Sequence, residues 1–234
     1  FKYDDKKAKE IRDAGFGVVN SHIQDGIARG TGILVALNGS GNDADRILDD
    51  ASAQYFSFDK SVAKTQSYPS SLMVSIALLR QMYSDADWYA KGSSKTKDLS
   101  LEALNKNKGL ISIFEAKDKG NALRADKIGD ANNIQYVILG GGNEYESINE
   151  IKGTNAKFIL PLNFPDAYDV SNPYQASYVT LEDMRYWNQA PANPKVMAEN
   201  GVSFSLTLYD LKSPSAFKDK LMQAIENGLS KTKA

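Results

Sequence analysis

Residues 134–164 read IQYVILGGGNEYESINEIKGTNAKFILPLNF. The apolar runs at 134–141 and 157–164 are short and nearly continuous, which is typical of strands covered on both faces. The segment between them, 144–155, is polar and carries its apolar residues at helical spacing. A strand, a helix and a second strand in this order predict two parallel neighbouring strands joined by a crossover helix.

The same rhythm continues on both sides of this stretch. LISIFEA (110–116) precedes a helical segment, and VSFSLTL (202–208) precedes a last amphipathic helix, for which Ser213 and Pro214 provide a start signal. Alternating strands and helices predict an α/β fold with a parallel sheet. No stretch is rich enough in proline, glycine and charge to divide the chain, so residues 1–234 are expected to form a single domain.

The first half of the chain is less regular. A helix closed by Gly15 is expected before a strand at 16–23, and a glycine-rich passage at 24–43 contains a second candidate strand at 33–38. The strongest helical pattern spans 70–90. A solvated linker at 91–100 and a short helix at 101–109 are expected to follow.

Composition excludes several classes of function. The formal net charge of −1 gives no electrostatic basis for binding nucleic acid or an anionic membrane, and no apolar run approaches the length of a membrane helix. The chain has no cysteine and one histidine, His22, which excludes disulfides, thiolate metal sites and multi-histidine metal centres within it. The expected partner is therefore a small-molecule substrate or ligand.

The three glycines Gly140–Gly142 permit three interpretations. Their amides could approach a phosphate at a helix start, although the run matches neither G-x-G-x-x-G nor a P-loop with its lysine. They could form a tight turn that uses positive φ. They could also mark the place where a larger functional side chain is missing.

Polar side chains near strand ends are the other candidates, because sites of parallel α/β proteins lie at the carboxyl ends of strands. Glu115 and Lys117 could form an acid–base couple or a simple ion pair. Asp210 could be a ligand or base, or could cap the helix that begins near Ser213. His22, after an early strand, could be a general base or a structural hydrogen-bonding group.

The order of several segments resembles the amidohydrolase superfamily, in particular its imidazolonepropionase-like branch. These segments are AKEIRDAGFGVVNSHIQDGIARGTGILVALNG (8–39), ASAQYFSF (51–58), YPSSLMVSIALLRQMYSDADWY (68–89), 113–164 and MAENGVSFSLTLYD (197–210). The resemblance covers nearly the whole chain through many weak similarities. It implies a metal-dependent (β/α)8 TIM-type barrel beside a small β-sandwich.

The resemblance also implies that the chain is an incomplete barrel, a fragment of a longer bacterial protein. The β-sandwich and the first barrel strand, with its His-x-His metal motif, would precede Phe1, and a closing segment would follow Ala234. These missing parts are then the expected protein partners. A periplasmic or secreted location is expected on the same ground.

The metal-ligand positions implied by the resemblance carry other residues here. Glu115 and Lys117 stand where a His-x-His would be and Gly141 where a further histidine would be. Tyr209 or Leu208 stands where a metal-binding aspartate would be, with Asp210 one or two residues beyond. The expected metal centre is degenerate, and zinc or another divalent metal would bind only if residues outside the chain complete a site.

The resulting hypothesis is a hydrolase by ancestry, of the class that acts on non-peptide C–N bonds. Its candidate catalytic residues are Glu115, Asp210 and His22, and its candidate pocket-lining residues are Lys117, Gly141, Asn143 and Tyr209. The alternative hypothesis is a non-catalytic binding or scaffolding domain of a longer protein of this family.

Overall fold

The first three strands form an antiparallel meander. A computed structural model describes residues 2–39, 41–62, 68–92 and 94–233. In it, β2 (Ala28–Ala36) pairs antiparallel with both β1 (Val18–Ser21) and β3 (Ile47–Ser57). The connections between these strands contain no α-helix in the described residues, and short connections of this kind join antiparallel neighbours.

The remaining strands are parallel to β3 and follow it in chain order. They are β4 (Ile111–Glu115), β5 (Val137–Leu139), β6 (Lys157–Pro161) and β7 (Phe204–Thr207). Helices separate them along the chain, which confirms the parallel βα units that the apolar runs of the second half predict. The described sheet has seven strands in the order β1 to β7.

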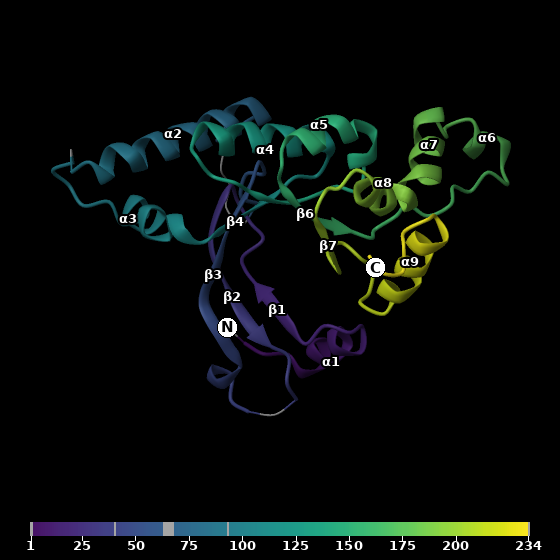
Figure 1. The fold of residues 1–234 in the computed structure, drawn as a ribbon, viewed down its shortest axis with the longest axis horizontal. Helices are drawn as coiled ribbons and strands as arrows, with labels where there is room; N and C mark the ends of the chain where they lie inside the picture. The colour runs from purple at the N-terminus through teal and green to yellow at the C-terminus, as the bar shows by residue number, and fades with distance from the viewer. Residues whose placement is uncertain (1, 40, 63–67, 93, 234) are drawn as a thin grey trace.

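The predicted (β/α)8 TIM-type barrel is therefore wrong. The described sheet is mixed and open, because β1 and β7 form its two ends and are not paired with each other. A (β/α)8 barrel has parallel strands throughout, whereas β1, β2 and β3 form the antiparallel meander. Only five strands are mutually parallel, and together they form a curled half-barrel (Figure 1).

The main core lies between the parallel strands and the helices on their outer side. The helices α2 (Leu72–Ala90), α4 (Lys119–Ala131) and α5 (Ile148–Gly153) extend along one side of the sheet in Figure 1. Aromatic and aliphatic side chains of the strands are completely or almost completely buried against them: Phe114, Ile138, Phe158 and Leu160, together with Leu79, Ile151 and Met197. This packing fixes the ends of the parallel strands relative to each other.

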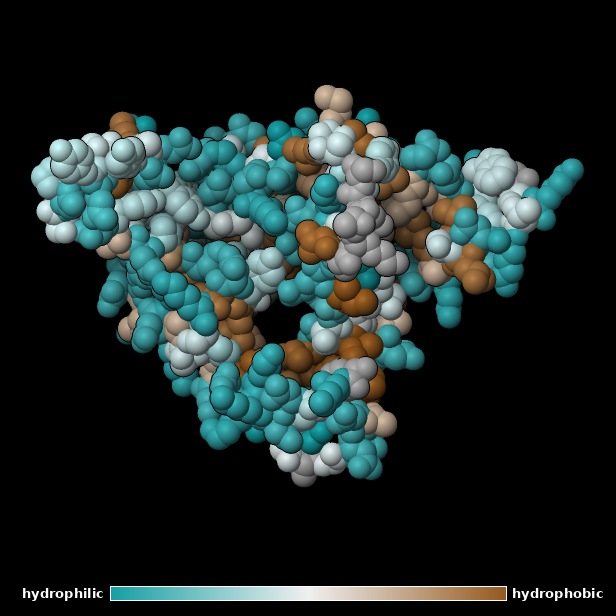
Figure 2. Space-filling view, turned by 180° about the vertical axis from the view of Figure 1, so that it is seen from behind, coloured by the Kyte–Doolittle hydropathy of each residue, from teal (hydrophilic) through white to brown (hydrophobic). Residues whose placement is uncertain are grey.

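The first and last helices lie near each other at the open side of the sheet. α1 (Asp5–Asp13) and α9 (Ala216–Glu226) are neighbours in Figure 1, and the rings of Phe16 and Phe217 make an edge contact with centroids 5.1 Å apart. Figure 2 shows a hollow between this lower part of the molecule and the main body, bordered by hydrophobic surface. Side chains, not strand pairing, thus link the two ends of the sheet.

The other α-helices are α3 (Leu99–Lys106), α6 (Pro173–Ala176), α7 (Leu181–Gln189) and α8 (Asn193–Glu199). Short 3-10 turns lie at η1 (Ala44–Arg46), η2 (Asn107–Gly109), η3 (Glu144–Ser147) and η4 (Ala190–Ala192). The α3 helix begins two residues before its predicted start because Asp98 caps it, accepting hydrogen bonds from two backbone amides. In the described ranges, no helix is both long and apolar enough to cross a membrane.

Candidate functional site at the carboxyl ends of the parallel strands

The parallel strands end at one edge of the sheet, and the predicted site residues follow those ends. Register places Glu115 of β4 beside Ser57 of β3 and Leu139 of β5, and pairs Pro161 of β6 with Thr207 of β7. The loops that follow therefore converge at this edge, as in other α/β proteins. Lys117, Gly141, Tyr209 and Asp210 all lie in these loops.

Two cavities lie at this edge and share Glu115, Lys117 and Tyr209 in their walls. The first, of about 430 Å³, also includes Arg29 and Asp59. The second, of about 370 Å³, extends over the turn of Gly140–Gly142, which we call the glycine turn, to the carboxyl ends of β6 and β7. It is also lined by Gly140, Gly141, Pro161, Asn163 and Asp210. We refer to the two together as the strand-end site.

A buried ion pair forms the centre of the strand-end site. An Nη of Arg29 donates to Oε2 of Glu115 at 2.5 Å, and the two side chains are 3% and 9% exposed. The hydroxyl of Tyr209 donates to the other carboxylate oxygen, Oε1, at 2.8 Å. Burial, followed by this hydrogen bond to Glu115, raises the pKa of Tyr209. Tyr209 is therefore a neutral donor at pH 7, and both oxygens of Glu115 have a partner.

The antiparallel meander explains why Arg29 reaches this position. Because β2 runs against β3, its first residue, Ala28, pairs with Phe56 near the carboxyl end of β3. Arg29 thus enters the strand-end site from the amino end of its own strand. The Nε of Arg29 also donates to the carbonyl of Gly26 at 3.0 Å, which fixes the guanidinium plane. Sequence reasoning did not assign Arg29 to Glu115, since 86 positions separate them.

Lys117 pairs with Asp59 and not with Glu115. Its Nζ lies 2.8 Å from a carboxylate oxygen of Asp59, on the loop after β3. This hydrogen bond to Asp59 is the main reason that the pKa of Lys117 is raised. The interpretation of Glu115 and Lys117 as an ion pair is wrong, because each residue has a different partner, and the acid–base couple stays a prediction.

Asp210 lines the strand-end site, whereas Asn143 does not. Asn163 donates its side-chain amide to Oδ2 of Asp210 at 2.9 Å, and Asp210 lines the second cavity with a positive φ of 60°. The α9 helix begins at Ala216, so Asp210 does not cap it. Asn143 lines neither cavity, because its side-chain oxygen accepts from the backbone amide of Lys119 at the start of α4.

His22 also lies outside the walls of both cavities. Its ring stacks on that of Tyr55, with centroids 3.5 Å apart and planes 5° from parallel. Desolvation in this position, together with the positive charge of Arg29, lowers the pKa of His22 to about 4. The imidazole is therefore neutral at pH 7, and the structure gives it packing contacts.

The lowered pKa of His22 predicts a loss of stability in mild acid. The unfolded chain takes up a proton near the ordinary value of 6.5 and the folded chain only near 4, so stability is lost as the pH falls between these values. We expect His22→Gln to remove on the order of 1–3 kcal/mol of this pH dependence. Urea unfolding of both proteins from pH 7 to pH 4.5 measures it, and parallel pH profiles would contradict it.

The glycine turn encloses a carboxylate of the chain itself. Glu144 is completely buried, and its Oε1 accepts from the amides of Gly141 at 2.7 Å and Gly142 at 3.2 Å. Its Oε2 accepts from the side-chain amide of Asn193 at 2.7 Å. The amides that could hold a phosphate are thus occupied by Glu144.

Each glycine of the turn has its own physical reason. Gly142 has a φ of +92°, which favours glycine. A Cβ on Gly140 would lie 2.3 Å from Oε1 of Glu144, and a Cβ on Gly141 would lie 2.2 Å from the carbonyl oxygen of Lys117. Close approach of backbone therefore excludes any side chain, histidine included, at position 141 in this conformation.

The described residues do not fit the metal centre that the amidohydrolase resemblance implies. Both oxygens of Glu115 are engaged by Arg29 and Tyr209, Lys117 presents an ammonium group, and Gly141 has no room for a ligand. The described ranges contain no group of three or more histidine, cysteine, aspartate or glutamate side chains placed to hold a metal ion. The chemistry of the site therefore depends on its own charged and hydrogen-bonding groups.

Comparison with known proteins supports the fold. No family model matches the sequence, and no curated protein matches it. Among solved structures, the fold is similar to that of an amidohydrolase from Thermotoga maritima MSB8, with a TM-score of 0.75 and 13% sequence identity. The fold is amidohydrolase-like. At this identity the likeness shows a shared fold.

The structural similarity covers different shares of the two chains. It covers 99% of this chain and 61% of the Thermotoga maritima chain. The chain therefore spans about three fifths of the length of that structure.

Proposed function

We propose that the chain is a domain of amidohydrolase ancestry whose strand-end site binds a small polar ligand in place of a catalytic metal centre. One observation carries this proposal: Arg29 and Tyr209 each bond one oxygen of the Glu115 carboxylate, where the resemblance implies a metal ligand. The buried guanidinium of Arg29 supplies the positive charge that organises the site, in place of a metal ion. In this proposal, hydrolysis of C–N bonds is the activity of the family from which the domain descends.

The walls of the site indicate the class of ligand. Positive groups of Arg29 and Lys117 alternate with the carboxylates of Asp59, Glu115 and Asp210. The Lys117 and Asp59 side chains are about half exposed, so an entering molecule reaches both. A ligand with a carboxylate at one end and an amine or amide at the other satisfies both signs of charge.

We expect zwitterionic probes to bind and Lys117→Met to weaken their binding about tenfold, because the ligand carboxylate loses its cationic partner. Saturation-transfer NMR with free amino acids and their carboxamides identifies binders, and calorimetry with the best binder measures the change. Lys127→Met, at an exposed lysine of α4 outside both cavities, is the matched control. Equal affinities of the two variants would contradict the proposed site, as would stoichiometric binding of two zinc ions by the chain in calorimetry.

The protein partner and the cellular location of the chain are also proposals. The remainder of a longer parent protein, with a β-sandwich and a first barrel strand, is proposed as its partner because the likeness covers 61% of the Thermotoga maritima structure. A periplasmic or secreted location stays a prediction.

A further inference from the structure

A separate cavity, the largest of those described, lies under α7 and away from the strand-end site. It has a volume of about 770 Å³, within the range of small-molecule sites. Its walls come from η3, α7, η4 and α8, and it shares no lining residue with the strand-end site: Tyr145, Glu146, Leu181, Glu182, Arg185, Gln189, Ala192 and Val196. We refer to it as the α7 pocket.

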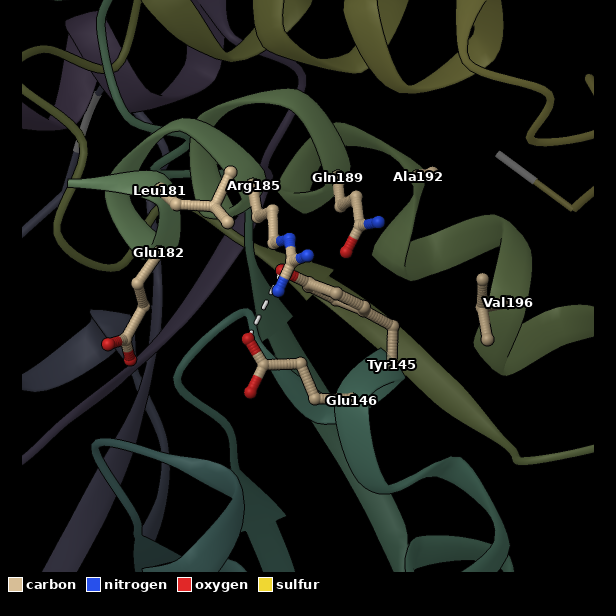
Figure 3. A pocket seen from close by; sticks show the side chains of 8 residues that line it. All are labelled: Tyr145, Glu146, Leu181, Glu182, Arg185, Gln189, Ala192 and Val196. Atoms are coloured by element: carbon tan, nitrogen blue, oxygen red, sulfur yellow. Dashed lines mark hydrogen bonds between the residues drawn. The ribbon is translucent and has the colours of Figure 1, made fainter.

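The charged groups of the α7 pocket differ in their partners. Glu146 is paired with Lys119 and accepts a hydrogen bond from the hydroxyl of Tyr145 at 3.3 Å, so its charge is compensated. Within the described residues, Arg185 forms no ion pair and no hydrogen bond. Figure 3 shows Arg185 extending from α7 towards Tyr145 and Glu146, whereas the carboxylate of Glu182 lies apart from the guanidinium. In the ranges that the structure describes, Arg185 is therefore the unpaired positive charge of the pocket, and Glu182 is an unpaired negative charge at its rim.

Part of the wall of the α7 pocket is apolar. Leu181, Val196 and the ring of Tyr145 provide hydrophobic surface around the guanidinium, and Leu181 is 64% exposed although it is a large aliphatic residue. Helix α7 is held rigidly at its start by a capping box, in which Thr180 and Asp183 bond each other's backbone amides. Within the described part of the chain, Arg185 thus projects from a fixed element into a cavity with one free positive charge and an apolar wall.

We propose that the α7 pocket binds a small organic anion with an apolar body. The carboxylate of the ligand pairs with the guanidinium of Arg185, which suits bidentate recognition of a planar anion. The aliphatic or aromatic body lies against Leu181, Val196 and the ring of Tyr145. This site is distinct from the proposed strand-end site and does not depend on it.

The test compares carboxylates with an uncharged probe and a cationic probe. Calorimetry with hexanoate, 3-phenylpropionate, hexanol and hexylamine is expected to show binding of the two carboxylates, at least tenfold tighter than of the alcohol or the amine. Arg185→Gln is expected to weaken carboxylate binding tenfold or more. Arg80→Gln, at an exposed arginine of α2 outside the pocket, is expected to leave it unchanged.

A second experiment shows where the ligand binds. The Nε–H signal of Arg185 in an NMR spectrum is expected to shift on addition of hexanoate, and Glu182→Gln is expected to raise hexanoate affinity about twofold by removing a like charge from the rim. Failure of both carboxylates to bind at millimolar concentration, equal binding of hexylamine, or undiminished binding by Arg185→Gln would each overturn the proposal.

Discussion

Replacing Arg29 with methionine is expected to lower the free energy of unfolding by about 3–5 kcal/mol. The substitution leaves the carboxylate of Glu115 buried at 9% exposure, with the hydroxyl of Tyr209 as its remaining side-chain partner. An uncompensated buried charge costs far more than the exposed ion pairs of the same chain contribute. Urea unfolding at pH 7, followed by circular dichroism, measures the difference between the variant and the parent protein.

Two controls separate this effect from a general loss of charge. Lys9→Met breaks an exposed pair with Asp13, whose side chains are 67% and 63% exposed, and is expected to cost less than about 0.5 kcal/mol. The double variant Arg29→Met with Glu115→Leu removes both buried charges and is expected to be more stable than Arg29→Met alone. If Arg29→Met costs no more than Lys9→Met, the ion pair does not organise the site.

Gly141→Ala is expected to lower the free energy of unfolding by about 3 kcal/mol or more. The added Cβ would meet the carbonyl oxygen of Lys117 at 2.2 Å and the amide nitrogen of Asp118 at 2.9 Å. Both atoms belong to backbone at the start of α4, so a side-chain rotation cannot relieve the contact. Thermal and urea unfolding measure the loss.

Gly153→Ala is the matched control, because a Cβ at Gly153 meets nothing within 4 Å and α5 is helical there. We expect a neutral effect or a gain of up to about 1 kcal/mol from the reduced freedom of the unfolded chain. Similar changes in the two variants would show that close backbone approach is not the reason for glycine at 141.

The parallel half of the fold could be predicted from sequence because its signal is local. Phe114, Ile138, Phe158 and Leu160 lie in continuous apolar runs that are typical of strands covered on both sides. The antiparallel meander could not, because the glycine-rich passage around Gly30 and the irregular β2–β3 pairing obscure the alternation of a strand.

The candidate site was predictable in position and not in its contacts. The rule that sites lie at strand ends brought Glu115, Lys117, Tyr209 and Asp210 to one edge of the sheet. The partners that decide their chemistry, Arg29 foremost, depend on tertiary pairing across 86 positions. The α7 pocket gave no sequence signal, because its walls are assembled from four separate turns and helices.

The buried carboxylate of Glu144 also determines how the glycine turn responds to free anions. A phosphate ion would have to displace a carboxylate that is attached to the same turn, three residues from Gly141. A tethered competitor acts at an effective concentration on the order of millimolar or above. The turn is therefore insensitive to ordinary changes in the phosphate concentration around it. Close backbone packing, not phosphate binding, is the reason for its glycines.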